Sequence, residues 1–208
     1  MNKLIGLLAL IFIANSCQLF ASVTPCSVGE LGPGGGYIFF CDNLEKKVLP
    51  EGKIGLEAAP SDQEKLPPWS NSSSYKGGYS ATSAIATDVG QGRENTRIII
   101  RNEGSGKDNS KISAAMSCYI RNDFKRNKDI HSYWFLPSIE ELDLMYKNLK
   151  LQNKGSFATL PHDFYWSSSE WQWISSSTDF AWAEDFNTGN KEYYPKATGY
   201  NVRCVRAF

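Results

Sequence analysis

The chain has 208 residues, and its 22 lysines and arginines balance 22 aspartates and glutamates, so the formal net charge at pH 7 is zero. This balance does not favour binding to nucleic acid or to an anionic membrane surface, because both attract basic proteins. The length suits one domain with an adequate core.

Residues 1–21 have the layout of a secretory signal peptide. Lys3 precedes an apolar run that extends to Ala14, and small or polar residues follow. That run is too short to span a bilayer as a helix, which needs roughly 20 residues. We therefore expect export, and a mature chain of residues 22–208 that forms a single domain, secreted, periplasmic or on the cell surface. Alternatively, Cys17 is the lipid-modified first residue of a lipoprotein, and the lipid is then the only membrane contact.

The predicted elements place strands at both ends of the mature chain and helices between them. Strands and helices are predicted, in chain order, at Tyr37–Cys41 (strand), Gly55–Ala59 (strand), Glu94–Arg101 (helix), Ser110–Arg121 (helix), Ile139–Leu149 (helix), Phe164–Ser168 (strand), Phe180–Phe186 (strand), Glu192–Pro195 (strand) and Asn201–Phe208 (strand). The stretch 60–87 is rich in Ser, Gly, Asn and Pro and is predicted to be an irregular loop. This order predicts an α+β domain whose N- and C-terminal strands share one antiparallel sheet.

Two of the predicted helices have a recognisable apolar face. The third helix begins with Ser138 as N-cap and Glu141 three positions later, the pattern of a capping box. Its apolar residues recur at helical spacing and are Ile139, Leu142, Met145, Tyr146 and Leu149. The second helix is predicted to bury Ile112, Ala115, Met116 and Tyr119.

Several motifs resemble one bacterial family. They are Gly35-Gly-Tyr-Ile-Phe-Phe40, Gly55-Leu-Glu-Ala-Ala-Pro-Ser-Asp-Gln63, Trp69-Ser-Asn71, the glycine-rich turn of residues 87–96, Tyr133-Trp-Phe-Leu-Pro-Ser-Ile-Glu-Glu141, Tyr165-Trp-Ser-Ser-Ser-Glu170 and Val202-Arg-Cys-Val-Arg-Ala-Phe208. In this order they resemble the family named for the C-terminal domain of the Legionella collagen-like adhesin. The resemblance implies a fold similar to C-type lectin-like domains, but it fixes no ligand.

Four cysteines remain after the leader, Cys26, Cys41, Cys118 and Cys204. An even number in an oxidising compartment favours two disulfides, for which three pairings exist. Proximity in sequence favours a bond between Cys26 and Cys41. The pair that remains, Cys118 with Cys204, resembles the long-range bridge of C-type lectin-like domains. Because no pair has C-x-x-C spacing, a zinc site is not predicted.

Motifs of catalysis are missing from the sequence. It contains no G-x-S-x-G elbow, no H-E-x-x-H pair and no Walker-type loop. We therefore expect no enzyme, and no cofactor. Calcium is the alternative to be weighed, since oxygens of Ser167–Glu170, Asp179, Glu184, Asp185 and Asn187 could surround a cation, although a hydrogen-bonded turn explains the same residues.

Two groups of residues are candidates for ligand binding. A basic cluster formed by Arg121, Lys125, Arg126 and Lys128 could hold sulfated or acidic polysaccharide, as the adhesin of the similar family suggests, or could be a solvated loop. Four aromatic residues, Trp171, Trp173, Tyr193 and Tyr194, could stack on sugar rings or pack in the core.

The sequence thus predicts an adhesin-like binding module that recognises a glycan or another component of a host or cell surface. The alternative is a structural subunit of a cell-envelope or pilus-like assembly that contacts protein. Either function is compatible with a homo-oligomer.

Overall fold

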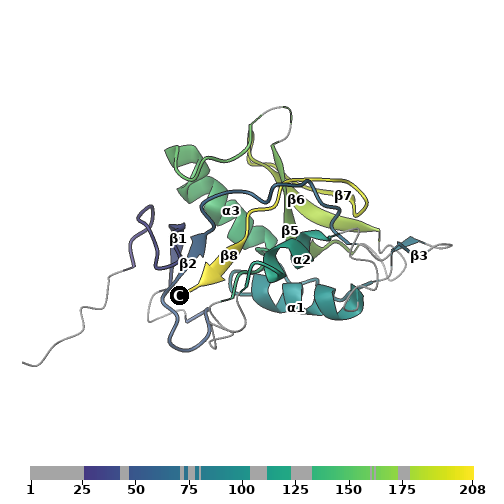
Figure 1. Cartoon of the computed structure of the whole chain (residues 1–208), viewed down its shortest axis with the longest axis horizontal. Helices are drawn as coiled ribbons and strands as arrows, with labels where there is room; N and C mark the ends of the chain where they lie inside the picture. Colours follow the sequence, from purple (N-terminus) through teal and green to yellow (C-terminus); the bar gives the residue numbers. More distant parts are fainter. Residues whose placement is uncertain are drawn as a thin grey trace, which may run out of the picture.

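The computed structural model describes residues 26–42, 47–70, 73–74, 78–79, 81–103, 112–122, 133–159, 161, 163–172 and 179–208. This part of the chain is a mixed α+β structure with two three-stranded antiparallel sheets and a short two-stranded ribbon (Figure 1). The α+β class is therefore as predicted from the sequence.

The first sheet joins the two ends of the described chain. It consists of β1 (Tyr37–Cys41), β2 (Gly55–Ala58) and β8 (Val205–Ala207), in the order β1-β2-β8. The prediction that N- and C-terminal strands share one antiparallel sheet is thus confirmed. The last strand is shorter than predicted, because residues 201–204 run between the two sheets instead of within one. The Asn201 carbonyl accepts a bond from the Trp166 N–H at 3.0 Å, and the Cys204 carbonyl accepts one from Ala59 at 2.8 Å.

The second sheet consists of β5 (Phe164–Glu170), β6 (Phe180–Asp185) and β7 (Lys191–Pro195), and β7 forms one edge of it. The stretch 60–87 is more ordered than the loop that the sequence predicts. It contains the ribbon of β3 (Ser73–Ser74) and β4 (Gly78–Tyr79). It also contains Trp69, which is fully buried and whose indole N–H donates to the Ser167 carbonyl at 2.7 Å.

Three α-helices pack on the sheets: α1 (Gly92–Glu103), α2 (Ala114–Tyr119) and α3 (Ile139–Asn148), with the short 3-10 turn η2 (Lys150–Gln152) after α3. Helix α3 contacts strands of both sheets, whereas α1 and α2 contact β5 and each other (Figure 1). Helix α3 thus packs against both sheets.

Helix α3 begins as predicted. The Ser138 hydroxyl accepts a bond from the Glu141 N–H, and the Glu141 carboxylate accepts one from the Ser138 N–H at 2.8 Å, so both halves of the capping box are present. The predicted apolar face packs in the core, with Ile139, Leu142 and Met145 buried.

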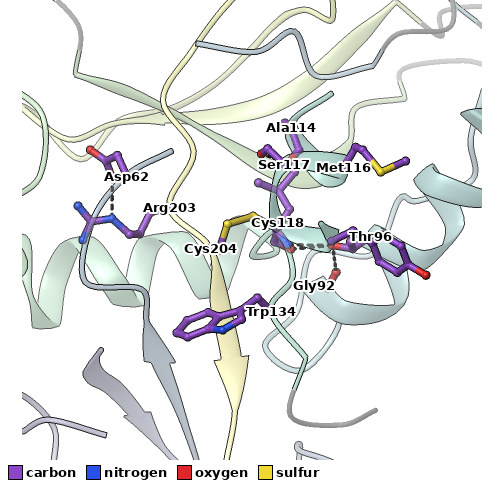
Figure 2. The surroundings of a disulfide bond; sticks show 12 residues. Asp62, Gly92, Thr96, Ala114, Met116, Ser117, Cys118, Trp134, Arg203 and Cys204 are labelled. Atoms are coloured by element: carbon purple, nitrogen blue, oxygen red, sulfur yellow. Dashed lines mark hydrogen bonds and ion pairs between the residues drawn. A yellow bond between two sulfur atoms is a disulfide. The ribbon is translucent and has the colours of Figure 1, made fainter. Parts of the chain in front are cut away.

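Helix α2 differs from its prediction in length and in the face that it buries. It ends at Tyr119 rather than at Arg121, and Tyr119 is 39% exposed instead of buried. The buried side includes Cys118, which is bonded to Cys204 (Figure 2). This bond turns the Cys118 side of a six-residue helix inward, and the apolar spacing alone could not reveal that constraint.

Both disulfides are as predicted, Cys26 with Cys41 and Cys118 with Cys204. They indicate an oxidising, extracytoplasmic location. Within the described residues, no helix combines the length and apolar character required to span a membrane. The predicted leader and Cys17 lie outside the described residues.

Candidate functional site

Strand β6 presents large aromatic side chains on one face and alanines on the other. Phe180 and Trp182 lie on one face, while Ala181 and Ala183 lie on the opposite face, which is fully buried. Because Tyr193 of β7 is the register partner of Trp182, its ring joins the aromatic face. Trp171 follows β5 directly and adds a fourth ring.

We call Trp171, Phe180, Trp182 and Tyr193 the aromatic shelf. Its central contact is a stack of Trp171 on Tyr193, with ring centroids 4.2 Å apart and planes at 19°. Phe180 and Trp182 meet Tyr193 edge-on at 5.7 and 6.1 Å. Tyr193 is 47% exposed, and the other three residues are partly exposed. The shelf is therefore a preformed aromatic surface at the edge of a sheet.

The aromatic shelf ends where helix α3 begins to cover the same face of the sheet. At that boundary the Lys191 ammonium of β7 binds Glu140 of α3 at 2.9 Å and lies 3.8 Å from Asp143. Lys191 is two residues from Tyr193 and lies on the same face of β7. This ion pair thus sets polar groups beside the aromatic rings.

Glu184 lies beneath this boundary, opposite Lys191 in the β6–β7 register. The side chain is fully buried, and neither carboxyl oxygen has a hydrogen-bond partner among the described residues. Burial, reinforced by the negative charge of Asp143, raises the pKa of Glu184 to about 9. The carboxyl is therefore protonated and uncharged at neutral pH.

The other two predicted aromatic residues do not join the shelf in the described structure. Tyr194 lies on the opposite face of β7, where its ring packs against Phe164 and Tyr200 at 5.1 Å each. This contact agrees with the alternative of core packing for that residue. Trp173 lies outside the described residues.

A second candidate surface forms around Trp134. The Arg121 guanidinium lies over the Trp134 ring at 5.1 Å from its centroid, and that of Arg206 lies at 5.4 Å. Arg206 also binds the buried Glu57 at 2.5 Å, whereas no described carboxylate lies within ion-pair distance of Arg121. Burial lowers the pKa of Arg121, and the positive charge of Arg203 acts in the same direction. Arg121 is thus a cation that lies over an indole ring and has no described counter-charge.

Asn122 holds Trp134 in place through two hydrogen bonds to its backbone. Its amide donates to the Trp134 carbonyl at 3.1 Å and accepts from the Trp134 N–H at 2.6 Å. The remaining residues of the predicted basic cluster, Lys125, Arg126 and Lys128, lie outside the described residues. The sequence did not identify Trp134 as a site residue, because an aromatic residue of a motif that precedes a helix can equally well pack in the core.

Two of the carboxylates considered for calcium, Glu170 and Asp185, are engaged within the chain, whereas that of Glu184 is buried without a described hydrogen-bond partner. Glu170 is fully buried in β5 and binds Lys196 and the N–H groups of Thr82 and Ser83. Asp185 accepts from the Asn187 N–H at 2.7 Å, so it closes the turn after β6. In the part of the chain that is described, no group of three or more His, Cys, Asp or Glu side chains is arranged to hold a metal ion.

No protein-family model matches the chain, and no curated protein matches it either. The resemblance to the adhesin family therefore stays a prediction that rests on the motifs.

Proposed function

We propose that this protein is an extracytoplasmic glycan-binding module with an adhesin-like role. The observation that carries the proposal is the stacked and exposed pair of Trp171 and Tyr193. Rigid aromatic rings at a surface supply a large apolar contact at low entropic cost, and the C–H face of a pyranose ring is complementary to their negative π-face. Because these rings hold one another in place, little ordering is required when a sugar binds.

The Trp134 surface supports a second contact, with acidic or sulfated sugars. A guanidinium donates bidentate hydrogen bonds to sulfate or carboxylate oxygens. The contact with Trp134 positions the Arg121 guanidinium, which has no described acidic partner. The basic residues Lys125, Arg126 and Lys128 follow it within the next seven positions and would extend the contact along a polyanion.

A C-type lectin-like fold is part of the proposal. It is supported by the pairing of terminal strands in one sheet and by the long-range bridge between Cys118 and Cys204. Membership of the adhesin family is proposed on the sequence motifs alone. We propose no catalytic activity. The glycan partner is proposed from the residues of the site and not from the fold.

A glycan array tests the proposal directly. The parent protein should bind at least one class of polysaccharide, and Tyr193→Ala should lose about 2- to 12-fold in affinity for that class, since a ring contact contributes about 0.5–1.5 kcal/mol. Tyr193→Phe keeps the ring and serves as the matched control that should bind as the parent does. A blank array together with co-purification of cell-envelope proteins would instead favour a structural subunit of an envelope assembly.

A heparin column tests the charged surface separately. Replacement of Arg121, Lys125, Arg126 and Lys128 by Ser should abolish retention, and retention of the parent should fall as salt shortens the Debye length from about 10 Å at 0.1 M to about 3 Å at 1 M. Arg97→Gln is the control, because Arg97 is exposed but paired with Glu94 at 2.5 Å. If the folded quadruple variant elutes with the parent, the cluster is a solvated loop.

A further inference from the structure

The charges around the aromatic shelf are opposite in balance to those of the Trp134 surface. Between residues 171 and 196 the sequence has four acidic residues and two lysines, which are Asp179, Glu184, Asp185, Glu192, Lys191 and Lys196. Residues 173–178, which lie outside the described structure, contain no charged side chain. Because Glu184 is protonated at neutral pH, three charged carboxylates stand against two lysines, and the segment that builds the shelf is acidic by one charge.

Neither lysine is available to an anionic ligand. Lys196 is fully buried in its ion pair with Glu170. Lys191 is committed to Glu140 at 2.9 Å, with Asp143 beside it. Displacement of Lys191 toward a sulfate or carboxylate on a sugar would leave Glu140 without this cation and Asp143 with Lys147 alone, which binds it at 2.7 Å. Both carboxylates would then face the incoming anion with one cation fewer. Such like charges at close range cost free energy instead of supplying it.

The same boundary suits uncharged hydroxyl groups. The Lys191 and Glu140 side chains are partly exposed, at 32% and 42%. An ammonium supplies donors and a carboxylate supplies acceptors, so both can bind sugar hydroxyls without breaking their ion pair. An apolar ring surface bordered by such a pair fits a neutral pyranose, whose faces are apolar and whose rim carries hydroxyls.

We propose that the aromatic shelf binds an uncharged pyranose unit and that acidic or sulfated sugars are excluded from it. Anionic glycans are then bound only at the Trp134 surface, so the protein carries two sugar contacts of different charge preference. This inference rests on the proposed glycan function and adds the substrate class of the shelf. It also assigns the Lys191–Glu140 pair as the group that binds hydroxyls and repels anions.

Affinity electrophoresis with matched polymers tests the inference. Suitable pairs share one backbone and differ in charge: hydroxyethylcellulose with carboxymethylcellulose, and dextran with dextran sulfate. The parent should bind the neutral member of at least one pair, with less than a twofold change between 0.05 M and 0.5 M NaCl, because no ion pair is formed. Tyr193→Ala should weaken that binding by about 2- to 12-fold and leave retention by the anionic polymers unchanged. Arg121→Gln should weaken retention by the anionic polymers and leave binding of the neutral one unchanged.

The charge of the boundary can be changed without loss of the rings. Glu140→Lys should allow the shelf to bind the anionic member of the pair whose neutral member the parent binds. This gain should vanish when Glu140→Lys is combined with Tyr193→Ala. Thermal unfolding of each variant confirms that it is folded. The inference is overturned if the parent binds sulfated polymers through Tyr193 and no neutral one, a result that would leave the glycan function intact. Absence of binding to every polymer would reject the glycan function itself.

Discussion

Glu184 should make the folded protein less stable as the pH rises, the opposite of the usual effect of a carboxylate that is paired in the folded state. Its pKa is raised from 4.5 to about 9 by burial and by the charge of Asp143, while Lys191 and Lys147 oppose the shift and Glu140 adds to it. Between these two values the folded protein holds a proton that the unfolded chain has released. The free energy of unfolding therefore falls as the pH rises, by about 1.4 kcal/mol per pH unit.

The variant Glu184→Gln removes this titration and keeps the shape of the protonated side chain. Its amide has the same lack of partners as the neutral carboxyl, so parent and variant should be similarly stable near pH 4.5. At pH 7.5, about three units higher, the variant should be more stable by roughly 4 kcal/mol. Burial raises the pKa of Glu141 to about 7, so this residue adds the same pH dependence to the parent and to the variant. Its contribution cancels in the difference between their free energies of unfolding.

Urea unfolding at several pH values between 5 and 8.5, with the disulfides intact, measures this difference. Glu64→Gln is a matched control, since it makes the same chemical change at an exposed position. The control should track the parent at every pH. If the advantage of Glu184→Gln stays constant with pH, the carboxyl is ionised in the folded protein and the reasoning from burial is wrong.

Three further predictions concern other parts of the chain. Non-reducing peptide mapping should recover Cys118 joined to Cys204 and find no free thiol in the mature protein; alkylation without reductant would contradict this. Gly92→Ala should destabilise the protein by more than 1 kcal/mol, measured by urea unfolding, because a Cβ there would collide with the buried Glu141 carboxylate. If Cys17 is lipidated, mass spectrometry of the membrane fraction should find a diacylglyceryl group on it, whereas a soluble chain starting near residue 22 would exclude the lipoprotein.

Elements with a complete local signal were predictable from sequence. Helix α3 has a capping box, an apolar stripe and a clear end, and its start matches the prediction. Strand β1 matches residue for residue. Arg203, within the last predicted strand, is fully buried and pairs with Asp62 at 2.6 Å, so its role is structural.

Details fixed by distant contacts were not predictable from local periodicity, although the bond between Cys118 and Cys204 was itself expected from the family resemblance. The buried side of α2 is set by a disulfide to a residue far along the chain, and the short final strand is set by hydrogen bonds that divide residues 201–208 between two sheets. Local periodicity carries no information on either constraint.

The aromatic shelf shows the same limit at the level of function. In strand β6 both faces are apolar, with Phe180 and Trp182 on one side and Ala181 and Ala183 on the other, so alternation cannot tell which face is covered. The small side is buried completely because alanines allow close packing, whereas the large side is covered only as far as helix α3 reaches. The rings of the aromatic shelf stay partly exposed because they lie beyond the first turn of that helix. The polar border of these rings includes Glu140, a residue of α3 that no sequence pattern connects with Tyr193, and the charge preference that we propose for the shelf rests on its contact with Lys191.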